Sequence, residues 1–526
     1  MFLKNSFKFS LIYTLILILQ TLSISLASLP QDLFHLKIAS KIRTDEQSLL
    51  SVSTDYGNLT TSIPDAVLYP SSPHDIFSLI RFSYTSSNPF PIAPRGNGHS
   101  INGQASAQDG VVINMMSLGY GYHSNRINVS IVNQYVDVGG EQLWIDLLHE
   151  TLKYGLTPRS WTDYLHLTVG GTLSVGGISG QTSRYGPQIS NVLELDVITG
   201  QGEMITCSKD QNSDLFLAVL GGMGQFGIIT RARIILSPAP QKVHWIRLVY
   251  TDVLTFTRDQ ERLISAENSE GSPLRLFNYV EGSFLVDRGL LGSWRSPEFF
   301  TDSDYDRMSQ LVTEDGLGGV YYIEGAVYYT DEITVQVNQE LELLLGELSY
   351  VPDYAFIRNV SYVEFLDRVH DGELKLRELG EWEVPHPWLN LFVPKSRILD
   401  FDAGVIKGIL SNRSAAGIIL MYPMNRNKWD DRMSTVIPDE EIFYTFGLLR
   451  TASRENLQVM IDENDKILQF CNLAGIKYKQ YLPHYATTKG WMKHFGKKWN
   501  NILAMKAKYD PELILSPGST ILSSYI

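Results

Sequence analysis

The sequence predicts an α+β protein with two domains, and three observations support this class. The chain has 526 residues, of which 44% are hydrophobic and 19% charged, as is typical of a folded globular protein rather than a disordered or coiled-coil chain. Short strand and helix patterns alternate up to about residue 238. After that point aromatic and acidic residues become more frequent, glycines become rarer and the helical patterns lengthen. A second domain is therefore expected there.

Residues 1–27 predict a secretory signal peptide. Lys4 and Lys8 precede an apolar run, and Ser25 and Ala27 fit the positions before a cleavage site at Ser28. A membrane anchor is the alternative, but polar residues interrupt the run before it reaches a comfortable span. No other stretch approaches a transmembrane length, so no span is expected after cleavage.

Four N-glycosylation sequons agree with this route, and they predict a secreted glycoprotein that is extracellular or vacuolar. They begin at Asn58, Asn128, Asn359 and Asn412. The only cysteines are Cys207 and Cys471, which excludes a disulfide-dense scaffold and a four-cysteine zinc site. In an oxidising compartment these two could pair, or they could be two buried thiols.

The elements of the first domain, about residues 30–238, follow from local patterns. Ser72 can cap a helix, Pro73 suits its first turn, and Asp75 occupies the capping-box position. Helices with an apolar face are also expected at 144–155 and 213–221, and a hairpin around the turn at 200–202. Further strands are predicted at 66–69, 111–113, 135–138 and 228–235.

Pro238 and Pro240 indicate the domain boundary. The second domain is expected over residues 239–480, and residues 481–526 form a C-terminal segment that ends in a Pro-Gly turn. The net charge of −13 disfavours nucleic-acid binding, because an acidic chain repels phosphate backbones.

Two glycine-rich loops are the candidate binding sites. In the first, from Pro94 to Gln104, three glycines within eight residues could turn successive N–H groups toward an anion such as a diphosphate. It matches neither a Walker loop nor a Rossmann fingerprint, and a plain glycine turn is at least as probable from spacing alone. The second loop, from Thr168 to Gly180, has five glycines mixed with hydroxyls and strengthens the case for a polar ligand.

From chemistry alone, His99 in the first loop reads as a surface or packing histidine. No histidine and carboxylate cluster has the spacing of a zinc site, so no metal is expected.

Together these segments resemble plant cytokinin dehydrogenases, members of the vanillyl-alcohol-oxidase-like flavoprotein superfamily, over nearly the whole mature chain. The glycine loop alone would indicate only the superfamily, and the later motifs are more specific. The matching segments are 96–100, 161–165, 170–174, 186–191, 221–233, 386–391, 422–429 and 515–518.

The resemblance implies a two-domain FAD-binding fold of the vanillyl-alcohol-oxidase (PCMH) type. The FAD domain would comprise residues 30–238 and the tail 481–526, and the α+β substrate domain would cap the flavin. His99 would be bonded covalently to the flavin 8α-methyl group. The other expected cofactor contacts are Pro94, Gly96, Asn97, Gly98, Ser100, Gln104, Asp163, Thr168, Ser174, Ile178, Ile228, Tyr481, Ser516 and Ser519.

The implied reaction removes the N6 side chain of a cytokinin of the isopentenyladenine or zeatin type. Hydride would pass to FAD, and water would split the resulting imine into adenine and an unsaturated aldehyde. Asp163 matches the catalytic acid and Glu281 the substrate-side glutamate. The substrate slot would be lined by Trp388, Asn390, Leu449 and Leu482. A quinone or oxygen would reoxidise the flavin, and a monomer is expected.

Two positions depart from the family pattern: Val175 replaces an Asn, and Ser519 replaces a Gln. Each loses an amide worth about 1 kcal/mol as a hydrogen bond, so FAD binding should be tuned rather than abolished. The alternatives are a carbohydrate or aldonolactone oxidase of the same superfamily, and a binding glycoprotein without turnover. The carbohydrate or aldonolactone oxidase lacks support from the sequence. Carbohydrate-oxidising relatives have a second covalent flavin link from a cysteine, and no cysteine occurs near Asp163; aldonolactone oxidases have a late His-Trp motif, and none is present.

Overall fold

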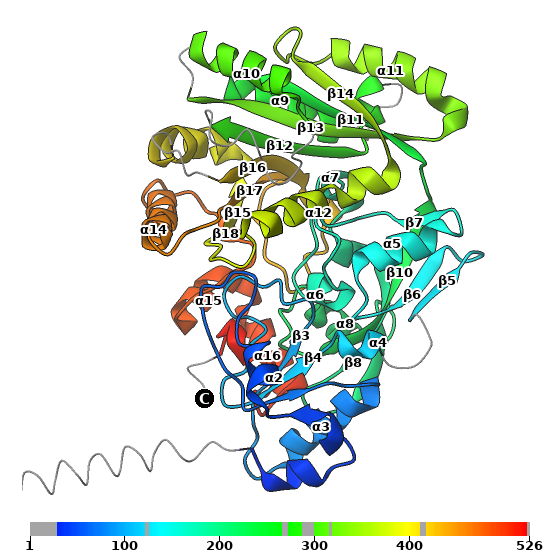
Figure 1. Ribbon diagram of the computed structural model, residues 1–526, viewed down its shortest axis with the longest axis vertical. Helices are drawn as coiled ribbons and strands as arrows, with labels where there is room; N and C mark the ends of the chain where they lie inside the picture. The colour runs from blue at the N-terminus through cyan, green and yellow to red at the C-terminus, as the bar shows by residue number, and fades with distance from the viewer. Residues whose placement is uncertain are drawn as a thin grey trace, which may run out of the picture.

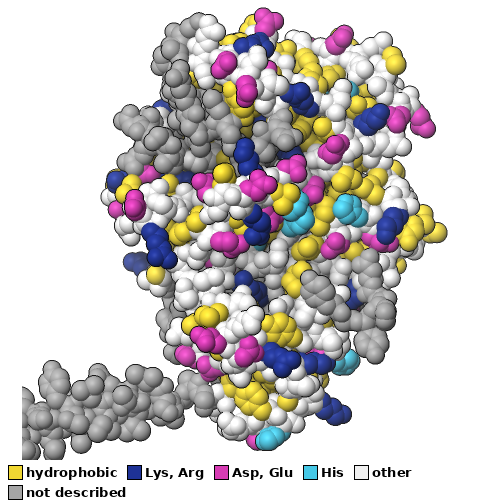
Figure 2. Space-filling model, in the orientation of Figure 1, with side chains coloured by type: hydrophobic (Ala, Val, Ile, Leu, Met, Phe, Trp, Pro, Cys, Tyr) yellow, Lys and Arg dark blue, Asp and Glu magenta, His cyan; other side chains and the backbone are white. Residues whose placement is uncertain are grey.

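A computed structural model of the chain describes residues 29–120, 126–265, 272–286, 299–314, 318–410 and 417–522. The predicted signal peptide at 1–27 and the predicted sequon at Asn412 lie outside the described residues. The molecule is elongated, with the N-terminal and C-terminal elements at one end and the middle of the chain at the other (Figure 1). On the face shown in Figure 2, acidic and basic side chains are interspersed rather than gathered by sign.

A small, mostly parallel sheet comes first. Its strand order is β1-β2-β4-β3, with β2 and β3 each parallel to β4. Helix α3 has the expected capping box between Ser72 and Asp75, which confirms that local prediction. The elements are β1 (Ile42–Arg43), α2 (Glu46–Leu50), β2 (Ala66–Leu68), α3 (Pro73–Thr85), β3 (Ile92–Arg95), β4 (Val111–Asn114) and α4 (Ser117–Tyr120).

A six-stranded antiparallel sheet follows, in the order β5-β6-β10-β8-β9, with β7 paired to β10. The predicted hairpin is the β8–β9 pair. The strands are β5 (Ile127–Ser130), β6 (Tyr135–Gly139), β7 (Leu156–Pro158), β8 (Val192–Ile198), β9 (Met204–Ser208) and β10 (Ile228–Pro238). The helices are α5 (Trp144–Leu152), α6 (Val169–Leu173), α7 (Thr182–Tyr185) and α8 (Ser213–Val219).

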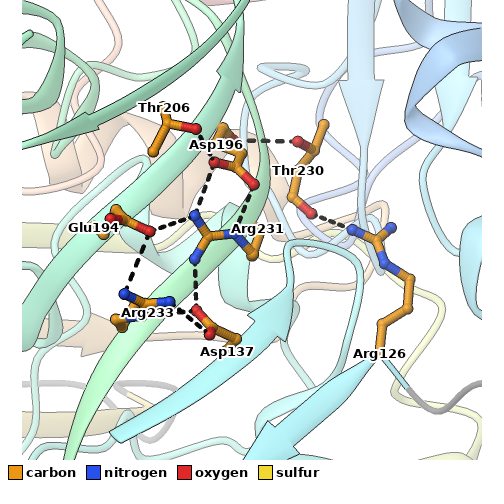
Figure 3. A network of polar contacts seen from close by, with 8 residues as sticks. All are labelled: Arg126, Asp137, Glu194, Asp196, Thr206, Thr230, Arg231 and Arg233. Atoms are coloured by element: carbon orange, nitrogen blue, oxygen red, sulfur yellow. Dashed lines mark hydrogen bonds and ion pairs between the residues drawn. The ribbon is translucent and has the colours of Figure 1, made fainter.

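An ion-pair network ties three strands of this sheet together (Figure 3). Arg231 on β10 contacts Asp137 on β6 at 2.5 Å and Asp196 on β8 at 2.6 Å. Arg233 adds a second contact to Asp137 at 2.8 Å. Burial would raise the pKa of Asp196, but the hydrogen bonds from Arg231 and Thr206 outweigh it and lower that pKa. This network joins β6, β8 and β10 and so stabilises the sheet.

The second part of the chain forms an eight-stranded antiparallel sheet in the order β14-β11-β13-β12-β16-β17-β15-β18. Its strands are β11 (Lys242–Tyr250), β12 (Tyr279–Val286), β13 (Gly319–Tyr329), β14 (Ala355–Ser361), β15 (Leu389–Pro394), β16 (Ile418–Asn425), β17 (Ile442–Leu449) and β18 (Lys479–Gln480). Its helices are α9 (Val253–Ser265), α10 (Asp302–Glu314), α11 (Thr334–Gly346), α12 (Tyr362–Leu379), α13 (Ile398–Phe401) and α14 (Leu457–Leu473).

The chain then returns to the first sheet. Helices α15 (Thr488–Phe495) and α16 (Trp499–Tyr509) lie near the N-terminal elements (Figure 1). Leu515 forms a parallel bridge with Ile92, and the N–H of Ser516 donates to the carbonyl of Ile92 at 2.9 Å. The tail thus runs alongside β3, directly before the first glycine loop.

The two faces of the eight-stranded sheet bury different apolar clusters. One face packs with α9, α11 and α14. The other, with Trp245, Tyr279 and Leu449, shares a cluster with residues of the six-stranded sheet such as Trp161 and Ile178. Cys207 and Cys471 are buried free thiols, one in each cluster. Of the helices described, none has the length and apolar character needed to cross a bilayer.

Candidate functional site

The first glycine loop is held in shape by two side chains. The Asp55 carboxylate accepts from the Ser100 hydroxyl at 2.8 Å and from the N–H of Gly103 at 2.7 Å. The Gln104 side chain accepts from the N–H groups of Ile101 and Asn102. Gln104 therefore braces the loop, whatever else it contacts. The side chain of Asn97 donates to the carbonyl of His166 at 2.7 Å.

This bracing leaves a row of donors unused. Among the described residues, the N–H groups of residues 96–100 donate no hydrogen bond to another residue. Gly98 has a φ of +69°, a left-handed conformation that glycine adopts without strain. A Cβ on Gly96 would lie 2.3 Å from the Thr168 hydroxyl, so this glycine lets the two loops approach. Free N–H groups in such a loop suit an anion, as predicted from the sequence.

His99 stands in an aromatic stack at the end of this row. Its ring lies on Tyr56 at 4.0 Å between centroids, and His386 covers the other face of Tyr56 at 4.2 Å. Trp388 lies 6.4 Å from His99. The His99 Nε2 atom is buried and has no hydrogen-bond partner among the described residues. Burial lowers the pKa of His99 to about 4, so its ring is neutral near physiological pH.

The second glycine segment is partly helical, which differs from the expected loop. Thr168 caps α6 by accepting from the N–H of Gly171 at 3.3 Å. Gly170 suits this helix because a Cβ there would lie 3.0 Å from the carbonyl of Gly140. Ser174 ends the helix and donates to the carbonyl of Gly170. Here close packing against the sheet outweighs the low helix propensity of glycine.

Beyond α6, the chain lies beside the C-terminal segment. The N–H of Gly177 donates to the Tyr481 hydroxyl at 3.1 Å. Burial raises the pKa of Tyr481, and nearby Asp163 adds to the effect. An open pocket with about 310 Å³ of empty space is formed here. Its lining includes Val175, Met223, Thr435, Tyr481, Leu482 and Phe495.

Asp163 lies where the second glycine segment meets the eight-stranded sheet. The Tyr279 hydroxyl donates to its Oδ1 at 3.0 Å, and Arg368 Nη2 lies 4.0 Å from the same oxygen. The Asp163 side chain is 20% exposed. Buried Trp161 and Leu165 supply apolar surroundings. A partly exposed carboxylate is thus placed at the junction of the two parts of the chain.

Helix α12 holds the loop that carries Asp163. The indole of Trp161 donates to the Tyr362 hydroxyl at 3.2 Å. Tyr164 donates to Glu373, and its ring contacts that of His99 at 4.9 Å. His166 pairs with Asp367 at 3.4 Å. The loop is therefore fixed on both sides of Asp163.

Glu281 is buried on β12, two residues after Tyr279, and so on the same face of the strand. Glu324 on β13 lies directly opposite Glu281 in the ladder. Asn390 on β15 pairs with Gly447 on β17, and its carbonyl accepts from the N–H of Tyr481 at 3.0 Å. Leu449 and Trp388 belong to the same apolar cluster as Trp161. Leu482 has a φ of +57° and lies beside Tyr481 at the pocket.

The remaining predicted cofactor residues lie toward the tail. Ser516 donates to the carbonyl of Gly224 at 3.0 Å, and Ser519 donates to the carbonyl of Ser516 at 2.8 Å. Gln225 donates to the Ser519 hydroxyl at 2.8 Å. Ile228 begins β10, and Pro94 lies within β3. Ser516, Ser519 and Gln225 link the tail to the glycine segment at 221–227.

Sequence reasoning missed the groups that surround His99 and Asp163. Tyr56 and His386 flank the histidine, and Tyr279 and Arg368 contact the carboxylate. Only Tyr279 had a local signal, since its spacing of two from Glu281 on a strand puts both on one face. The others are brought in from distant segments, which a single sequence cannot reveal.

Comparisons with known proteins agree with this geometry. The family model "Cytokinin dehydrogenase 1, FAD and cytokinin binding" matches residues 240–522, and the model "FAD binding domain" matches residues 64–208. The chain is 53% identical over 501 residues to cytokinin dehydrogenase 6 of Oryza sativa subsp. japonica, with 94% of each chain covered. The chain belongs to the cytokinin dehydrogenase family.

Two solved structures show the same fold at low identity. The 6-hydroxy-D-nicotine oxidase from Arthrobacter nicotinovorans has a TM-score of 0.63 and 18% identity, and covers 90% of this chain and 95% of its own. A BBE-like 1 variant from Physcomitrella patens has a TM-score of 0.66 and 14% identity, and covers 91% and 96%. The expected two-domain flavoprotein fold is confirmed.

The residues present fit FAD, the cofactor of this cytokinin dehydrogenase family member. The unused N–H groups of residues 96–100 suit its diphosphate, and the orphaned His99 Nε2 atom lies at the end of that row. The chain is thus an FAD-dependent oxidoreductase. Its family membership excludes the carbohydrate and aldonolactone alternative.

Proposed function

We propose that this protein cleaves the N6 side chain of cytokinins of the isopentenyladenine or zeatin type, giving adenine and an unsaturated aldehyde. The observation that carries the proposal is Asp163, a partly exposed carboxylate fixed by Tyr279 between the glycine segments and the eight-stranded sheet. When bound, FAD supplies the acceptor for the hydride that leaves the carbon next to N6.

Asp163 supplies the electrostatic part of the reaction. Its carboxylate accepts a hydrogen bond from the N6–H and offsets the positive charge that develops on the C–N unit as hydride departs. Trp161 and Leu165 are buried beside it and limit water, which strengthens its field. Water then splits the imine into the amine of adenine and the aldehyde.

The residues that recognise the substrate lie on or beside the eight-stranded sheet. Glu281 accepts a purine ring N–H, and Trp388 and Leu449 pack against the planar ring and the isoprenoid chain, as apolar sites with few polar groups do. Asn390 and Leu482 complete the slot beside Tyr481.

The cofactor is held by the FAD domain, which we take as residues 30–238 with the tail 481–526. Residues 96–100 donate to its diphosphate, with Gln104 as the brace of that loop. The other residues that contact the cofactor are Thr168, Ser174, Ile178, Ile228, Tyr481, Pro94, Asn97, Ser516 and Ser519.

FAD is also bonded covalently to His99. A neutral imidazole is the nucleophilic form, and burial keeps His99 neutral. The Nε2 atom has no other partner among the described residues. Acid-precipitated wild-type protein should remain yellow, and His99→Ala should lose all acid-stable flavin. His386→Gln is the matched control, since His386 stacks on the same Tyr56. A colourless wild-type precipitate would refute the linkage.

The function is tested by anaerobic mixing with isopentenyladenine. We expect the flavin absorbance to bleach, and Asp163→Asn to slow bleaching by about 10²–10³-fold, as for one transition-state electrostatic partner. Binding should weaken much less, because the charge matters most in the transition state. Absence of bleaching in wild type would refute the activity. Bleaching of the mutant within a few-fold of wild type would remove Asp163 from the mechanism.

The protein is further proposed to follow the secretory route, to the apoplast or a vacuole, and to act as a monomer with a quinone or oxygen as acceptor. Asn128 is exposed on β5 and Asn359 on β14, so both suit N-glycosylation. Asn58 instead donates to the carbonyl of Glu383. N-terminal sequencing that returns Met1, or no mass loss with a glycosidase, would contradict this route.

A further inference from the structure

We propose that Tyr279, Arg368 and Glu324 form a relay that positions the Asp163 carboxylate, with Tyr279 acting on it directly. This inference rests on the proposed function of Asp163. Tyr279 comes from β12, Glu324 from β13 and Arg368 from α12, whereas Asp163 belongs to the first part of the chain.

The chemistry of the groups fixes the direction of the relay. Arg368 Nη2 lies 2.6 Å from the Tyr279 hydroxyl, and a guanidinium can only donate. The hydroxyl oxygen therefore accepts from Arg368 and directs its own proton to Asp163 Oδ1 at 3.0 Å. A phenol polarised in this way is a stronger donor to a carboxylate than an isolated one.

Arg368 has little freedom to move. Its Nε donates to Glu324 at 3.1 Å, its Nη1 donates to the carbonyl of Phe365 at 2.8 Å, and its Nη2 donates to the Tyr279 hydroxyl. The guanidinium also lies 4.4 Å from the centroid of the Phe365 ring. Three hydrogen bonds from three nitrogens define one orientation, so the position of Tyr279 Oη is defined too.

Glu324 connects this arginine to a second one. Arg247 donates to the other oxygen of Glu324 at 2.9 Å through Nε and at 2.7 Å through Nη2. Arg247, Glu324 and Arg368 are 3%, 6% and 4% exposed. Two guanidiniums thus share the Glu324 carboxylate, and this buried pairing holds Arg368 in place beside Asp163.

The tyrosine ring is fixed by the glycine segment. A Cβ on Gly180 would lie 2.7 Å from the Tyr279 ring, and the N–H of Val280 donates to the carbonyl of Gly180 at 3.2 Å. This close approach explains one glycine that the sequence suggested for ligand contact. Tyr279 is 1% exposed, and its hydroxyl is held at Asp163 by both backbone and ring contacts.

The test compares Tyr279→Phe with Tyr328→Phe by single-turnover flavin reduction with isopentenyladenine. Tyr328 is a matched control because its buried hydroxyl accepts from Gln181 at 2.9 Å on the next strand, β13. We expect Tyr279→Phe to slow reduction by roughly 10- to 100-fold, the size of a hydrogen bond to a charged group. KM and the affinity for adenine should change by less than about threefold, and Tyr328→Phe should stay within about twofold.

A double mutant separates positioning from general stability. In the Asp163→Asn background, Tyr279→Phe should slow reduction by less than about threefold, because residues that act through one another are not additive. Full multiplication of the two effects, or a Tyr279→Phe rate within threefold of wild type, would overturn the relay. Wild type that fails to bleach would instead refute the proposed function.

Arg368→Lys keeps the test valid if Tyr279→Phe does not load FAD. A lysine retains the charge but lacks the planar fork that reaches Glu324 and Tyr279 together. We expect a reduction rate lower by about 10-fold with an unchanged melting temperature. A wild-type rate in Arg368→Lys would overturn the relay in that case.

Discussion

Replacing Lys506 by Met should loosen the contact between the C-terminal segment and the glycine segment at 221–227. Lys506 on α16 and Asp510, the residue that follows this helix, form an ion pair at 2.7 Å, and their side chains are 3% and 0% exposed. The ammonium also donates at 3.1 Å to the carbonyls of Gln225 and Leu515 and to the Gln225 side chain. One buried cation thus joins the glycine segment at 221–227 to the strand that lies beside β3.

The magnitude follows from what the substitution leaves behind. Burial already lowers the pKa of Lys506. The charged form of its side chain is therefore stabilised only by the groups that it contacts. Without it, the Asp510 carboxylate stays buried with no cation, and removing one partner of such a pair costs about 3–5 kcal/mol. Asp510 also accepts from the N–H groups of Ile514 and Leu515. The loss of stability should therefore be greatest in the residues directly before Ser516.

The assay is native-state hydrogen exchange on peptides covering residues 510–520. Local opening of these peptides should increase by roughly 10²–10³-fold in Lys506→Met. The purified variant should also contain less flavin than wild type. Lys508→Met is the control, since Lys508 pairs with Asp214 on the surface at 55% and 41% exposure, and such pairs contribute about 0–1 kcal/mol. Adding Asp510→Asn should recover part of the loss. Equal exchange in Lys506→Met and Lys508→Met would refute the reasoning.

Two further predictions concern the substrate side and the loop that carries Asp163. Glu281→Gln should change the ratio of free-base to nucleotide turnover, because a buried anion on β12 repels phosphate; an unchanged ratio with a collapsed rate for every substrate would contradict this role. His166→Gln should lower stability at about pH 5.5 and have little effect at about pH 8.5. The Asp367 carboxylate, 3.4 Å from His166 Nε2, raises the pKa of His166 above its ordinary 6.5, so this stabilisation is present below pH 6.5 and is lost as the pH rises through the raised value. Thermal melts of both proteins at the two pH values would check it, and equal differences at both would count against the pair. Four other titratable groups face His166: His370, which stacks on it at 3.9 Å, Tyr164 at 5.5 Å, Glu373 and Asp146.

Local patterns predicted the elements of the first domain well, because their causes are local. The capping box at Ser72 and Asp75 and the β8–β9 hairpin depend on neighbouring residues, and both are present. The segment after Thr168 was harder. Its glycines indicated a loop, yet α6 forms there because Gly170 packs against the carbonyl of Gly140, a contact that no local pattern contains.

The site was predictable only where a motif carried it. His99 and Asp163 followed from family motifs, and the structure places both at the junction of the two parts of the chain. Tyr56 and Arg368 were not predictable, because each reaches the site from a segment far away in sequence. The bracing role of the Gln104 side chain was not predictable either, and its cofactor contact stays a prediction.

The arrangement around Asp163 couples domain docking to chemistry. The carboxylate comes from the first part of the chain, while Tyr279 and Arg368 come from the second. Helix α12 supplies the arginine and also binds Trp161 and Tyr164 on either side of Asp163. A displacement of α12 would therefore move the loop and remove the donor to the carboxylate in one event. In the proposed mechanism, Asp163 has its donor only when the two parts are docked, so mutations at this interface should reduce hydride transfer before they reduce flavin content.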